Sequence, residues 1–193
     1  MKPMNEDLYF QFKSRAEELT VKVRRAKTAE QAVGLALEEM GQQGSKRAAA
    51  APLHCLNMKE LAARARSRGI DICLTLDRSG IEQADLGISE FSLGIAGLGS
   101  IVQDASGLHT RLVSMLPPRH LALLPTGCLV ETFADALAVI ERNYGVTMPP
   151  FLSFITGPSK TADIERQLTI GVHGPERLIV LCVDQAGGWL SCR

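Results

Sequence analysis

The segment from Phe151 to Asp184 constrains the fold of this chain most strongly. It contains two short apolar runs, 151–155 and 178–183, separated by a polar stretch long enough for a helix. Apolar runs of this length, flanked by Gly and Pro, are typical of buried strands, and strands joined through a helix run parallel in one sheet. The segment therefore predicts a strand–loop–helix–loop–strand unit, with the helix beginning near Thr161, and a parallel sheet around it.

The loop before this predicted helix, TGPSKT at residues 156–161, has the composition of an anion-binding corner. Backbone N–H groups, hydroxyls and an ammonium group at a helix N-terminus favour a bound anion. The loop is not a nucleotide-binding P-loop, because Phe154 and Ser159 stand where that motif needs glycine. A capped helix with a solvated lysine is the alternative interpretation. The predicted ligand-binding residues here are Thr156, Gly157, Ser159, Lys160 and Thr161.

Composition excludes several classes of protein. The 21 basic and 21 acidic residues cancel, so the chain lacks the charge of a nucleic-acid-binding protein. No apolar run approaches the roughly 20 residues that span a bilayer, and the polar N-terminus is unlike a secretory signal. We therefore expect a soluble, cytoplasmic protein. The cysteines form no C-x-x-C pair and the histidines no i,i+4 pair, so no metal site or iron–sulfur cluster is predicted on this chain.

The pattern of apolar residues divides the chain into two parts. The first forty residues have helical spacing, and Thr28 is expected to cap a helix that ends near Gly41. A polar linker follows, so we predict an N-terminal helical appendage over residues 1–44. From residue 45 to residue 193, helices alternate with short apolar strands, and Asn57 is a second expected helix cap. This alternation predicts an α/β domain whose mostly parallel sheet has helices on both faces.

Three further positions are candidates for chemistry. Glu90 follows a predicted strand, and in open α/β sheets the carboxyl ends of strands carry ligands, so it could act as a base or nucleophile. A solvated glutamate is the alternative. His173 lies between glycines, where its ring could reach the 156–161 loop. The Gly-rich stretch GIAGLGS, 94–100, lacks the order of a dinucleotide fingerprint, but Gly99 and Ser100 could let a ligand approach the backbone.

Several of these motifs together resemble one family. The sequences ITGPSKTADIE (155–165) and GVHGP (171–175) closely resemble the ending of the LUD-domain family, the lactate-utilisation protein C group. LPPRHLAL (116–123) is similar to its P-P-x-H-I-A strand. After an Ala-Asp pair the family reads I-A-E-T-G-[TS]. Here Glu90 and the Gly99-Ser100 step are both present, separated by an insertion at Phe91–Leu98, which leaves open whether Glu90 keeps its family position.

The resemblance implies a compact fold like that of the NagB/RpiA/CoA-transferase superfamily and a role in the oxidation of L-lactate to pyruvate. It also implies two iron–sulfur partner proteins that carry the clusters, so that no cofactor binds this chain directly. The first hypothesis is an accessory subunit of that complex, binding a small anion at the TGPSKT corner. One alternative is a stand-alone acyl- or CoA-transferring or nucleotide-dependent enzyme that uses Glu90. Another is an assembly module that docks through its N-terminal helices.

Overall fold

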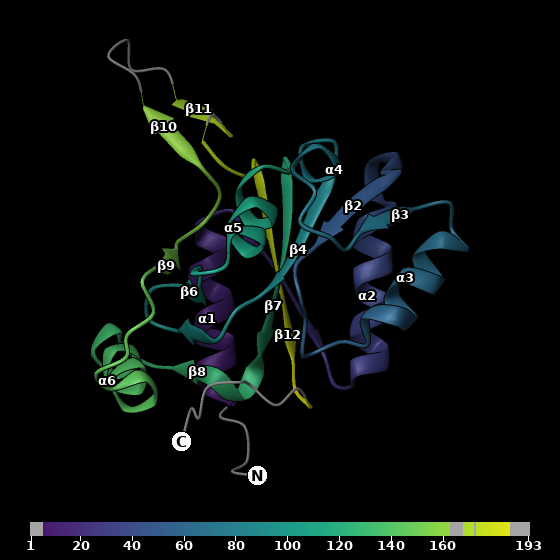
Figure 1. The fold of residues 1–193 in the computed structure, drawn as a ribbon. Coiled ribbons are helices and arrows are strands. Elements are labelled where there is room, and N and C mark those ends of the chain that lie inside the picture. The colour runs from purple at the N-terminus through teal and green to yellow at the C-terminus, as the bar shows by residue number, and fades with distance from the viewer. Residues whose placement is uncertain (1–5, 163–167, 172, 186–193) are drawn as a thin grey trace.

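The computed structural model describes residues 6–162, 168–171 and 173–185 of the chain. Its main layer is a six-stranded sheet in which every pair of neighbouring strands is parallel. The predicted parallel sheet is therefore confirmed, and Figure 1 shows it running through the centre of the molecule. In spatial order its strands are β1 (Lys22–Ala26), β12 (Arg177–Val183), β7 (Arg119–Pro125), β4 (Leu86–Glu90), β2 (Arg47–Ala50) and β3 (Asp71–Cys73).

Helices cover both faces of this sheet, as predicted. They are α1 (Glu6–Glu18), α2 (Ala29–Gly41), α3 (Met58–Arg66), α4 (Arg78–Glu82) and α5 (Leu108–Met115). Side chains alternate across a strand, so Leu121 and Leu123 of β7 pack with α2 and α3, whereas Ala122 and Leu124 pack with Phe12 of α1. Helices α4 and α5 pack on the α1 face. None of the helices in the described ranges is long and apolar enough to span a bilayer.

Two helices begin at the caps that the sequence predicts. The Thr28 hydroxyl accepts a hydrogen bond from the Gln31 N–H at the start of α2, at 3.1 Å. The Asn57 side chain accepts hydrogen bonds from two backbone N–H groups in the first turn of α3. A capping side chain of this kind stabilises a helix by about 1 kcal/mol, because it satisfies N–H groups that have no partner inside the helix.

A second, smaller sheet lies on the α1 face. In spatial order its strands are β8 (Leu129–Val130), β5 (Leu93–Ile95), β6 (Ser100–Asp104) and β9 (Leu152–Ile155), with β5 and β6 antiparallel. The helix α6 (Phe133–Tyr144) covers its outer side through Ala136, Val139 and Ile140. The Phe91–Leu98 segment, which the sequence resemblance suggests is an insertion, has a structural role, because it supplies β5 and the turn that leads into β6.

The predicted unit over residues 151–184 is wrong in two respects. The first apolar run, β9, belongs to the second sheet and does not pair with β12. The expected helix start at Thr161 is instead part of a strand, β10 (Lys160–Ala162), which forms an antiparallel hairpin with β11 (Leu168–Ile170). Thr161, Thr169 and Ile170 are β-branched and favour strands. This hairpin projects away from the sheet in Figure 1.

The N-terminal segment is only partly helical, which corrects the prediction for residues 1–44. Residues 22–26 form β1, which pairs along β12 from Lys22↔Ile179 to Ala26↔Val183. Phe12 and Ala16 of α1 are fully buried against the same sheet. Residues on both sides of position 44 thus contribute to one sheet and its packing. The division of the chain at this position stays a prediction.

Candidate functional site

The strands β2 and β4 are neighbours whose outgoing connections diverge. After β2 the chain passes through α3 on one face of the sheet to β3, and after β4 it passes through the second sheet and α5 on the other face to β7. In open α/β sheets, ligands bind outside the carboxyl ends of two strands that diverge in this way. Glu90 is the last residue of β4 and lies at this point.

The Glu90 carboxylate is held firmly on one side and is unpaired on the other. Its Oε2 accepts hydrogen bonds from the backbone N–H groups of His54 and Cys55, at 2.5 and 3.0 Å, in the loop after β2. The His54 ring, 68% exposed, has Nδ1 3.8 Å from the same oxygen, whereas the Glu90 side chain is only 3% exposed. Glu90 Oε1 is buried and has no hydrogen-bond partner within the described residues. The carboxylate can therefore accept another hydrogen bond.

A buried polar network supports the end of β4. Ser89 Oγ lies 2.9 Å from His120 Nε2 and accepts a hydrogen bond from the Gln103 amide of β6, at 2.8 Å. The same Gln103 amide donates to the Glu90 carbonyl, at 3.1 Å. Burial lowers the pKa of His120 to about 4, so the ring is neutral at physiological pH. Gln103 thus ties the second sheet to the strand that carries Glu90.

The two loops of the predicted anion corner do come together. The Ser159 N–H donates to the Pro175 carbonyl and the Gly171 N–H donates to the Ser159 carbonyl, both at 3.0 Å. Ser100 Oγ lies 2.7 Å from Thr156 Oγ1. The corner nevertheless lacks the predicted helix N-terminus, since β10 follows it, and the Ser159 N–H is already used within the protein.

The remaining predicted residues do not converge on Glu90. Pro175 lies two residues before the start of β12, so the corner is at the amino end of the sheet. Glu90 lies at the opposite end. The Lys160 and His173 side chains are exposed, and Gly157 lies against α1 near Leu19. Gly99 also lies against α1. The predicted site is therefore divided between the two ends of the sheet.

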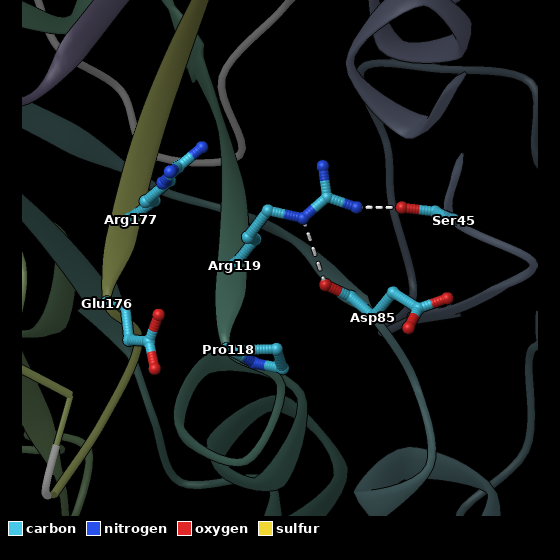
Figure 2. Close-up of a pocket in the computed structure, with 6 residues that line it drawn as sticks. All are labelled: Ser45, Asp85, Pro118, Arg119, Glu176 and Arg177. Atoms are coloured by element: carbon cyan, nitrogen blue, oxygen red, sulfur yellow. Dashed lines mark hydrogen bonds between the residues drawn. The ribbon is translucent and has the colours of Figure 1, made fainter. Parts of the chain in front are cut away.

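The amino end of the sheet also has a pocket of about 240 Å³, drawn in Figure 2. Arg119, on β7, is nearly buried there and donates hydrogen bonds to the carbonyls of Glu39, Gln42 and Asp85 and to the Ser45 hydroxyl. Burial lowers the pKa of Arg119. Because two of its acceptors, the Glu39 and Gln42 carbonyls, lie at the end of α2, we assign Arg119 a structural role in fixing that helix end.

Several residues around Glu90 were not predicted from the sequence. His54, Cys55 and Gln103 reach it from segments distant in sequence, and no local pattern marks them. Ser89 and His120 do carry a signal, because each is a polar residue inside an apolar strand sequence, LGISE and RHLALLP. Buried polar residues of this kind need a hydrogen-bond partner, so each could have been sought as part of a pair.

Comparisons with known proteins were made by sequence and by structure. The lactate utilization protein C of Bacillus subtilis is 38% identical over 105 residues, which cover 53% of this chain and 44% of that protein. The lactate utilization protein C of an Exiguobacterium species is 39% identical over 104 residues, covering 52% and 45%. The matched segment thus spans less than half the length of these relatives.

A solved structure supports the fold over nearly the whole chain. The crystal structure of a DUF162 family protein from Deinococcus radiodurans superposes with a TM-score of 0.67 at 20% identity, covering 92% of this chain and 97% of that one. At this identity the likeness concerns the fold alone. The family model of the LUD domain matches residues 9–183. The chain therefore belongs to the LUD domain family, as its sequence motifs indicated.

Proposed function

We propose that this chain takes part in the utilisation of L-lactate as a component that works with iron–sulfur partner proteins. The names of its relatives support the pathway, since those proteins are lactate utilization proteins C. The partners would carry the clusters and accept the electrons. In this arrangement the LUD chain holds the substrate or a related small anion.

The substrate contact that the geometry supports best is Glu90. The observation that carries this proposal is the fixed, buried carboxylate with one oxygen lacking a partner. A 2-hydroxy acid has a hydroxyl that can donate to Glu90 Oε1. Its own carboxylate could pair with the exposed His54 ring, 3.8 Å from Glu90 Oε2. Glu90 would then be placed to accept the hydroxyl proton as a general base.

The test compares L-lactate with pyruvate, which has a carbonyl in place of the hydroxyl. Replacing Glu90 with glutamine should weaken L-lactate binding about tenfold or more in calorimetry, because a hydrogen bond to a charged group contributes about 1.5–3 kcal/mol. Pyruvate cannot donate to Glu90, so its binding should change little. Lys160→Ala is the matched control at the other end of the sheet, and melting temperatures check that each variant is folded.

Two outcomes would contradict this assignment. L-lactate binding that is unchanged in Glu90→Gln would remove Glu90 from the site. Loss of binding in Lys160→Ala would return the site to the corner of residues 156–161, where anion binding is a proposal with weaker support, because the Ser159 N–H is engaged.

An acyl-transferring enzyme is the second candidate function, and the same buried Glu90 favours it. In that case the carboxylate would be the nucleophile toward a thioester. Thioester exchange by the wild-type protein that is lost in Glu90→Gln would support this function over lactate binding. Absence of exchange in both proteins would count against it.

A further inference from the structure

Among the residues that the structure describes, the outer edge of the second sheet is open. Strand β9 is the last strand in the order β8-β5-β6-β9 and pairs on one side only, with β6. Its sequence, Leu152 to Ile155, contains no charged residue and no proline. Natural proteins usually protect an exposed edge by keeping it very short or with charges, proline or a covering element, because its unpaired backbone groups can bind another strand. β9 is short, with four residues, but has no charge or proline of its own. No strand within the described residues covers this edge.

Apolar side chains lie beside the same edge. The rings of Phe133, at the start of α6, and Phe154, on β9, are in contact, with centroids 5.5 Å apart. Leu137 follows Phe133 by four residues and so lies on the same side of α6. These three side chains are 46%, 40% and 47% exposed, in that order. We call the open edge of β9 with Phe133, Leu137 and Phe154 the β9 surface.

The charge beside the β9 surface indicates what kind of partner fits it. Helical spacing places Glu141 on the same side of α6 as Leu137, four residues on, whereas Asp135 and Arg142 lie on the opposite flank. If a second copy paired its α6 antiparallel about Leu137, Glu141 would face Phe133 of the other copy. That arrangement would place a carboxylate against an aromatic ring without a counter-charge. A second copy that added its own β9 would supply no basic residue either, since Leu152 to Ile155 has no charge, so a different strand that carries a basic residue fits better.

We propose that the β9 surface docks an extended segment of a different protein, which adds a strand along β9. Its apolar side chains would cover Phe133, Leu137 and Phe154, and a Lys or Arg beside them would pair with Glu141. Strand addition of this kind takes affinity from backbone hydrogen bonds and specificity from alternate side chains. The proposal concerns a protein partner and does not depend on the ligand bound near Glu90.

The structure also disfavours the docking element expected from the sequence. The N-terminal helices were the predicted docking segment of an assembly module, but the apolar residues Tyr9, Phe12 and Ala16 of α1 are buried in the fold. The face of α1 that carries these three residues is therefore already covered, and of the apolar residues of α1 Phe10 alone is largely exposed, at 60%.

A labelled-peptide experiment on the full chain tests the proposal. The probes are two short peptides of alternating valine, phenylalanine and threonine, one ending in lysines and the other in glutamates, measured by fluorescence anisotropy. The lysine-ended peptide should bind the wild-type protein about fivefold more tightly than the glutamate-ended one. In Glu141→Lys this preference should reverse. Leu137→Asp, at an exposed position that leaves the core intact, should lose binding of both peptides.

Three results would overturn the proposal. One is the failure of either peptide to bind the wild-type protein. Another is a charge preference that Glu141→Lys leaves unchanged, since the basic contact would then lie elsewhere. The third is a wild-type dimer in sedimentation analysis that Leu137→Asp converts to a monomer, because the β9 surface would then be occupied by a second copy.

Discussion

Gly99→Ala is expected to lower the free energy of unfolding by about 3–4 kcal/mol, through backbone strain and overpacking together. Gly99 has a φ of +64°, in the left-handed region that favours glycine. A Cβ there would lie 2.6 Å from the Ala16 nitrogen and 2.8 Å from the Arg15 carbonyl carbon, both backbone atoms of α1. Because a helix backbone cannot turn aside as a side chain can, α1 would have to move. Urea unfolding of the two proteins measures the effect.

Gly34→Ala is the matched control for this prediction. Gly34 lies within α2, and a Cβ there would meet nothing within 4 Å. Alanine should stabilise the helix at this position by roughly 0.5–1 kcal/mol, because glycine loses more backbone freedom on folding. A Gly99→Ala protein with normal stability but altered ligand binding would contradict the structural role and support the ligand contact predicted from the sequence.

The second large effect is expected from acid. Burial lowers the pKa of His120 from 6.5 to about 4. The unfolded chain therefore binds a proton near pH 6.5 that the folded protein does not bind until near pH 4. As the pH falls through this window, protonation favours the unfolded state, and stability should fall by about 3 kcal/mol in total. Above pH 6.5 the ring is neutral in both states and makes no such contribution.

The His120 contribution can be isolated by difference. Urea unfolding should be measured from pH 7.5 to pH 4 for the wild-type protein and for His120→Gln, whose amide cannot titrate but can still hydrogen bond to Ser89. The carboxylates titrate in both proteins, and so does His109, which also has its pKa lowered by burial. Their contributions to the pH dependence of stability therefore cancel in the comparison. The wild-type curve should fall more steeply below pH 6.5. Parallel curves would show that His120 titrates alike in the folded and unfolded chains.

Features that depend on neighbouring residues were predictable from the sequence. The caps at Thr28 and Asn57 join residues within three or four positions, so the motif itself specifies the hydrogen bonds. Likewise α6 ends at Gly145, a residue whose φ of +54° suits the end of a helix. The parallel sheet followed from alternating apolar runs and helices. In each case a local pattern contains most of the determinants of the structure.

Features that depend on distant pairing were not predictable in this way. The TGPSKT loop carries the local signals of a helix start, but pairing between Thr161 and Thr169 places it in a hairpin. Residues 22–26 become β1 because β12, far along the chain, offers a parallel partner. Glu90 was found as a candidate, yet its environment depends on which strands adjoin β4. That order is a property of the whole sheet and of no single motif.

The position of β12 between β1 and β7 bears on how the chain is made. β1 is synthesised before its only partner in the six-stranded sheet, β12, which is the last strand in the described residues. The two are separated by roughly 150 residues, so at about 5–20 residues per second β1 waits for roughly eight to thirty seconds of synthesis. During that time α1 and β1 cannot complete their packing. In nascent chains the apolar residues of α1 and β1 should therefore stay without their sheet partner until β12 has been synthesised.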